Sequence, residues 1–312
     1  MPNSIKIYQT KRNLNIYPDV IIRRGTIILL VTVTLLFGLG IIWLNHTPSL
    51  QHIWSNYFVD KKVPASFCEK TGLSNPVRQP INTFSSIIYL IIAIIIFKKS
   101  WEERYSSDTY NLTTANKTYS FLFGFVLLYV FAASSFYHAS LISPAHRLDY
   151  SAVFSFSLFP AMFLLYGRWF RPNNKLLTNQ RRKSSAIFFL SFLTILFLLT
   201  FLIPKEKEKV AVLVLILIFF SFAFFELKNK PDNPGSHYLV LSISSVLIGL
   251  LWFEFDRYKI LCNPGSYFQM HSLWNLFIGV SAFYFFLYMR SEHKSATSIS
   301  NDVIKKIKKK AL

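Results

Sequence analysis

The 312-residue chain is poor in charge and in cysteine. Asp, Glu, Lys and Arg make up 16% of it, below the roughly 25% of an average soluble domain. Two Cys are too few for a disulfide-rich secreted module. No stretch alternates between apolar and polar residues with a period of two, which argues against a lipid-facing β-barrel. No polar stretch is long enough for a large soluble domain.

Hydrophobic residues, in contrast, make up 52% of the chain and include 32 Phe. With a mean hydropathy of +0.36, this composition excludes a disordered or nucleic-acid-binding protein despite the net charge of +19. A bilayer-crossing helix needs roughly 20 mostly apolar residues. The sequence therefore predicts an all-α, polytopic membrane helix bundle with eight spans, at 26–44, 83–97, 119–138, 150–167, 185–203, 209–226, 237–255 and 269–289. The first is interpreted as an uncleaved span, because its apolar core is too long for a signal peptide and no cleavage site follows it.

The distribution of Lys and Arg predicts the orientation. With the N-terminus in the cytoplasm, the cytoplasmic segments hold 24 of the 34 Lys and Arg. Both termini are then cytoplasmic, and a bacterial inner membrane and a eukaryotic endomembrane fit equally well. The expected organisation is a basic N-terminus, an extra span, an outer loop, a seven-span core and a basic tail, at 1–25, 26–44, 45–82, 83–289 and 290–312.

Polar residues inside a membrane bundle are costly and suggest function. The outer ends of three spans carry them at similar depth. Ser134 and His138 are four residues apart on one helix face, as are His271 and Asn275, and Asp149 opens the fourth span. Two imidazoles near a carboxylate suit Zn²⁺, with the carboxylate as base and a hydroxyl as donor to an oxyanion. The alternative is that each His caps a helix or lies at the membrane interface.

Both cysteines, Cys68 and Cys262, also fall on the outer side. An oxidising compartment would permit a disulfide between them. Two unpaired thiols remain the alternative.

Taken together, residues 66–290 resemble the alkaline ceramidase family, within a superfamily of seven-span membrane hydrolases that includes the adiponectin-receptor-like proteins. The resemblance rests on the order and spacing of short stretches: Phe67-Cys68-Glu69, the run from Gln79 to Ser85, Ser134-x3-His138, Asp149 eleven residues beyond His138, Cys262-Asn263-Pro264, and the run from His271 to Asn275. The span 26–44 looks like an addition to the seven-span core.

The resemblance implies a zinc amidase that cleaves the N-acyl bond of ceramide-like sphingolipids, with a membrane lipid as its substrate. By position, His138 and His271 would be zinc ligands. Asp149 would orient or deprotonate the zinc-bound water, and Ser134 would stabilise the oxyanion. The resemblance also implies the family's disulfide, between the two cysteines.

This sequence departs from the family at the last zinc ligand, where Asn275 replaces a histidine. An amide oxygen is a weaker zinc ligand than imidazole. We hypothesise that His146, or Asn275 through its oxygen, completes the site. His237 belongs to the cytoplasmic side, about 30 Å away across the bilayer.

A second departure concerns calcium. Of the acidic residues expected near the start of the core, Glu69 remains, whereas Gln79 and Ser66 replace acids. A degraded calcium-like site is the expectation, which weakens the case for calcium as a second cofactor.

Three functions follow in order of support. The first is a metal-dependent hydrolase of a lipid amide. The second is a non-catalytic descendant, a lipid-binding, receptor-like or scaffold protein that kept the fold. The third is a transporter, which needs polar residues along a full pore, and the inner half offers few beyond His237 and Glu226. No protein partner is indicated.

Overall fold

The computed structural model describes residues 24–57, 67–102, 117–169, 178–229 and 235–291. Within them the chain is helical, which confirms the predicted fold class. The elements are α1 (Arg24–Asn45), η1 (Pro48–Leu50), α2 (Pro80–Ser85), α3 (Ile87–Glu102), α5 (Thr118–Ser140), α6 (Ser143–Trp169), α7 (Thr178–Leu202), η3 (Lys205–Lys207), α8 (Glu208–Asn229), α9 (Ser236–Arg257) and α10 (Met270–Ser291). Nearly all of the predicted N-terminal and C-terminal segments, and Ser66, lie outside these ranges.

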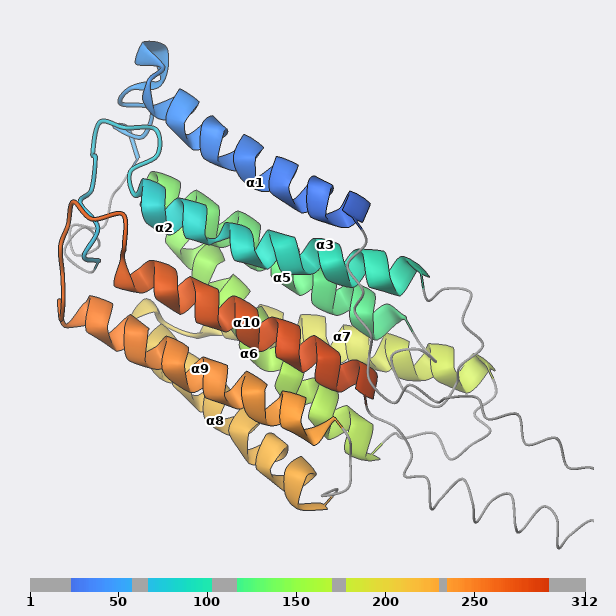
Figure 1. Cartoon of the computed structure of the whole chain (residues 1–312). Coiled ribbons are helices and arrows are strands. Elements are labelled where there is room, and N and C mark those ends of the chain that lie inside the picture. Colours follow the sequence, from blue (N-terminus) through green and yellow to red (C-terminus); the bar gives the residue numbers. More distant parts are fainter. Residues whose placement is uncertain (1–23, 58–66, 103–116, 170–177, 230–234, 292–312) are drawn as a thin grey trace, which may run out of the picture.

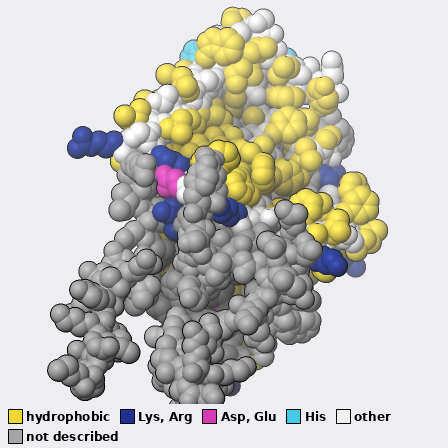
Figure 2. All heavy atoms as spheres, turned by 90° about the vertical axis from the view of Figure 1, so that its right-hand side faces the viewer, with side chains coloured by type: hydrophobic (Ala, Val, Ile, Leu, Met, Phe, Trp, Pro, Cys, Tyr) yellow, Lys and Arg dark blue, Asp and Glu magenta, His cyan; other side chains and the backbone are white. Residues whose placement is uncertain are grey.

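Eight helical stretches in these ranges are long and apolar enough to cross a membrane, as predicted. Consecutive α2 and α3 form one of them, and η3 with α8 forms another. In Figure 1 the helices run roughly along one direction, with α1 on one side, α8 on the other, and α5, α6 and α7 behind α3, α10 and α9. The start of α1 and the end of α10 lie at the same end of the bundle. We call this end the inner end and the opposite end of the bundle the outer end. Figure 2 shows Lys and Arg side chains around the inner end, next to a broad hydrophobic surface.

The fourth span begins earlier than predicted. Its helix α6 starts at Ser143 instead of residue 150, because Pro144 falls in the first turn, where a proline costs no helical hydrogen bond. The extension includes His146 and Asp149, which the sequence also places at the opening of the fourth span. The short second span is likewise lengthened to Pro80–Glu102 by its flanks.

Aromatic side chains fill the inner half of the bundle. Phe123 of α5 stacks on Phe159 of α6 with ring centroids 4.8 Å apart, and Phe285 of α10 packs edge-on against Phe123 and Phe163. All four are fully buried. The two buried histidines, His138 of α5 and His271 of α10, lie at the opposite, outer end.

Candidate active site

Two imidazoles meet at the outer end of the bundle. His138 lies in the last turn of α5 and His271 in the first turn of α10, and their ring centroids are 4.7 Å apart. Both are buried, with 1% and 6% of the residue exposed. Phe67 packs edge-on against the two rings, at 5.0 and 4.9 Å. The structure therefore brings together two residues that are 133 positions apart in the sequence, as the span order predicted.

Gln79 orients the ring of His138. Its Oε1 lies 2.7 Å from His138 Nδ1. A carbonyl oxygen can only accept, so Nδ1 carries the proton and Nε2 keeps its lone pair. The backbone N–H of Gln79 also donates to the carbonyl of His138, at 3.1 Å. Gln79 is fully buried, and this double contact fixes it at the end of α5.

Asp256 faces the Nδ1 side of the His271 ring. Its Oδ2 lies 4.0 Å from His271 Nδ1, and its Oδ1 accepts from the backbone N–H of Cys68 at 3.0 Å. The carboxylate favours the proton on Nδ1 and leaves the lone pair on Nε2. Metal-binding histidines typically have such an acceptor behind them. The sequence places Asp256 among the polar residues of the outer side, but its role behind His271 was not predicted.

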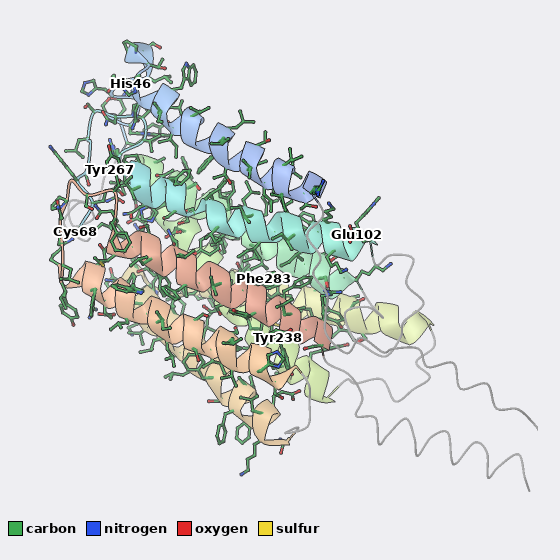
Figure 3. The ribbon with its side chains drawn as sticks, viewed as in Figure 1. His46, Cys68, Glu102, Tyr238, Tyr267 and Phe283 are labelled. Atoms are coloured by element: carbon green, nitrogen blue, oxygen red, sulfur yellow. A yellow bond between two sulfur atoms is a disulfide. The ribbon has the colours of Figure 1, made fainter. Side chains whose placement is uncertain are left out.

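Cys68 and Cys262 form a disulfide, as the resemblance implied, with their Cα atoms 5.5 Å apart. It joins the segment before α2 to the loop before α10, and the backbone N–H of Lys70 adds a bond of 3.0 Å to the carbonyl of Pro264. Figure 3 places Cys68 at the end of the bundle opposite Glu102. The link keeps the Cys68 N–H on Asp256.

Ser134 and Asp149 lie close to His138. Ser134 is on α5, one helical turn before His138, and its Oγ accepts from Ser86 Oγ at 3.2 Å. Ser134 is buried, and Asp149 is half-buried on α6, next to Ser134. The structure thus places the predicted pair of catalytic residues side by side.

Asn275 is occupied by two hydrogen bonds. Its Oδ1 accepts from the hydroxyl of Tyr89 at 3.1 Å, and its Nδ2 donates to Ser85 Oγ at 2.8 Å. These bonds tie α10 to α3 and α2. The proposal that Asn275 binds a metal through its oxygen stays a prediction, and any such contact competes with Tyr89.

His146 lies on α6 opposite α8. Its Nδ1 is 3.8 Å from Glu208 Oε2, and its ring packs against Tyr137 and Tyr150. Glu208 is also paired with Arg147, at 2.9 Å. The role of His146 as a substitute ligand also stays a prediction. His237 is at the other end of α9 from Asp256, beside Tyr238.

Glu69 caps a helix. Its two carboxylate oxygens accept from the backbone N–H groups of Ile81 and Asn82, at 2.7 and 2.8 Å, at the start of α2. Burial and the nearby Asp256 raise the pKa of Glu69 to about 7, although the two N–H groups act in the opposite direction. Of the residues expected to mark a degraded calcium-like site, Glu69 thus supports α2 and Gln79 supports His138.

The donor set around the histidines fits two ligands of a zinc site. Nδ1 of His138 is hydrogen-bonded to Gln79, and Nδ1 of His271 is buried without a hydrogen-bond partner and faces Asp256 at 4.0 Å, which leaves Nε2 of each ring for a metal. Among the residues that the structure describes, no three His, Cys, Asp or Glu side chains form a group that could hold a metal ion. The pair is therefore one imidazole short of a three-histidine site.

Comparison with known proteins adds one finding to this geometry. The family model described as Ceramidase matches residues 64–307, more than three quarters of the chain. None of the curated proteins compared with the chain matches it. The matched range holds every site residue described above and begins after α1.

Proposed function

The chain belongs to the ceramidase family, and on that premise we propose that it is a zinc-dependent amide hydrolase that cleaves the N-acyl bond of ceramide-like lipids. The observation that carries the proposal is the pair of buried histidines, His138 and His271, each with an acceptor behind Nδ1.

His138 and His271 would hold the ion through Nε2. A bound zinc ion lowers the pKa of a water and polarises the carbonyl of the scissile amide. A third protein ligand is the usual number in a catalytic site. Asn275 and His146 are the two candidates for it, and each would have to leave a contact that it makes now.

Asp149 and Ser134 supply the proton chemistry. Asp149 accepts a proton from the attacking water and returns it to the amine that leaves when the C–N bond breaks. Ser134 turns its hydroxyl from Asp149 to the oxyanion that forms on the former carbonyl. Ser86, which donates to Ser134 Oγ, keeps that oxygen in place during the change.

The surface beside Asp149 suits an acyl chain. An open groove of about 580 Å³ lies between α5, α6 and α7, and its lining is largely apolar. Leu148 and Ser151, which flank Asp149 on α6, form one wall, and Leu193, Phe197 and Phe201 of α7 contribute to the other. A lipid chain in this groove would lie against the face of α6 that carries Leu148 and Ser151, and Asp149 itself does not line the groove.

We further propose that the inner end of the bundle faces the cytoplasm and that the active site lies at the outer side. The support is the excess of Lys and Arg in the segments at the inner end. Reporter fusions to each terminus test this, since both are expected to report a cytoplasmic location.

The test of the function uses purified protein in detergent and a panel of N-acyl lipids that includes ceramide. The wild type should bind zinc and hydrolyse at least one lipid. Asp149→Asn should lower the rate about 10²–10⁴-fold, as expected for loss of a general base. Glu254→Gln, which removes a half-buried carboxylate from an ion pair with Arg257 on α9, is the matched control and should retain the rate.

Equal background rates in the wild type, Asp149→Asn and His271→Ala would contradict the enzymatic proposal. A folded, inactive protein that still binds ceramide would support the non-catalytic alternative.

A further inference from the structure

We propose that α1, the helix outside the family-matched range, holds the active site in place through Asn45, which acts as a positioning residue for His138. The inference rests on the metal-binding role proposed above for His138. It concerns how that ring is held.

Asn45, the last residue of α1, pairs with the backbone of Val77 as a neighbouring strand would. Its Nδ2 donates to the carbonyl of Val77 at 3.1 Å, and its Oδ1 accepts from the N–H of Val77 at 2.8 Å. Two further bonds join the same segments. The N–H of His52 donates to the carbonyl of Ser74 at 2.8 Å, and Trp54 Nε1 donates to the carbonyl of Pro76 at 2.7 Å.

The residues that follow Val77 contact the end of α5. The N–H of Arg78 donates to the carbonyl of Ala139 at 2.9 Å, and its guanidinium donates to the carbonyl of Ser140 at 2.7 Å. Gln79 then makes its two contacts with His138. Val77 and Arg78 are therefore the residues that separate the amide of Asn45 from Gln79, the group that orients the imidazole.

The rest of α1 packs loosely, which makes the bonds at its end distinctive. Thr26 and Ile41 are its buried residues, and most of its large apolar side chains are exposed, as expected for a lipid-facing helix. Phe37 reaches the rings of Phe84 and Phe131, at 6.4 and 5.2 Å. A helix whose main function was to cover the core would bury more of its surface. At the start of α1 the Thr26 hydroxyl accepts from Lys98 Nζ of α3, and at its end the hydrogen bonds of Asn45 are with the segment that carries Gln79.

The experiment follows the ring of His138 directly. Protein labelled with ¹⁵N at histidine is prepared as wild type, Asn45→Ala, Gln79→Ala and the double variant, and His138→Gln assigns the signal. The imidazole ¹⁵N shifts report which nitrogen carries the proton, with or without zinc. Zinc affinity is measured on the same proteins. Thr34→Ala is the matched control, because the Thr34 hydroxyl bonds within α1 to the carbonyl of Leu30.

Asn45→Ala should move the His138 signals toward those of Gln79→Ala and weaken zinc binding about tenfold, at the lower end of the effect of changes behind a metal ligand. In the Gln79→Ala background, Asn45→Ala should have no further effect, because Asn45 acts on His138 through Gln79. Asn45→Asp keeps the acceptor for the Val77 N–H, so its His138 signals and zinc affinity should lie between those of the wild type and of Asn45→Ala. Thr34→Ala should match the wild type.

Unchanged His138 signals in Asn45→Ala, or additive losses in the double variant, would overturn the inference. Absence of lipid hydrolysis in the wild type would instead count against the proposed function, because the ring signals do not depend on turnover.

Discussion

Replacing Asp256 by Asn should weaken zinc binding at the histidine pair by about tenfold or more. In the wild type the carboxylate lies behind His271 and favours the proton on Nδ1. The amide of the variant can keep the bond from the Cys68 N–H through its oxygen. Its NH₂ group then faces His271, favours the tautomer with the proton on Nε2, and so blocks the nitrogen that would bind the metal.

The size of the effect follows from the geometry. Changes behind a metal-binding histidine cost 10–100-fold in affinity, about 1.4–2.7 kcal/mol. The 4.0 Å between Asp256 Oδ2 and His271 Nδ1 is longer than a hydrogen bond, which places the loss of attraction at the lower end. The repulsion between two donors in the variant adds to it.

The assay is a competition titration of metal-free protein against a zinc-binding dye in detergent. Glu254→Gln is the matched control, since it removes a half-buried carboxylate two residues earlier on α9 from an ion pair with Arg257. Equal affinities in Asp256→Asn and wild type would refute the argument that the carboxylate orients His271. An equal loss in Glu254→Gln would show a general effect of charge.

Three further predictions concern the surroundings of the site. Because the pKa of Glu69 is raised from 4.5 to about 7, the folded protein favours the protonated carboxyl. The contribution of Glu69 to stability is therefore full below pH 4.5 and is lost as the pH rises through about 7, a change of about 3 kcal/mol in the free energy of unfolding. The thermal midpoint of the wild type relative to Glu69→Gln should therefore fall between pH 5 and pH 8, and parallel curves would contradict this. Replacing Cys68 and Cys262 by Ser should lower the thermal midpoint. In a soluble chain, a disulfide that closes a loop of 194 residues stabilises the fold by about 5 kcal/mol. The loss of stability should be smaller here if the membrane spans persist in the unfolded state. No change in the midpoint would show that the link adds nothing to stability. Asn275→His should tighten zinc binding by adding an imidazole. The lost hydrogen bond with Tyr89 should lower the free energy of unfolding by about 1–3 kcal/mol. An unchanged zinc affinity would place residue 275 away from the ion.

The sequence was sufficient for the number and order of the spans. Long apolar segments separated by charged loops identify crossings, and alternating crossings place the ends of successive helices on known sides. That reasoning predicted that His138, Asp149 and His271 would share the outer end.

The contacts behind these residues could not be predicted in the same way. Asp256 and Gln79 orient the two imidazoles through distances that depend on how α9 and the segment before α2 fold back on the bundle. The direction of His146 depends on the start of α6 at Ser143, seven residues before the predicted start of the apolar span at residue 150. Hydropathy identifies a helix, whereas the partner of each side chain is a property of the packing.

The disulfide also has a topological consequence. Cys68 precedes the first helix of the family-matched core and Cys262 precedes the last, so that the covalent bond closes all the intervening spans into a ring. A single cut of the backbone anywhere between the two cysteines leaves one covalently connected molecule, with His271 still tethered to the segment that orients His138. Such a nicked protein should migrate as one species without reductant and as two fragments with it.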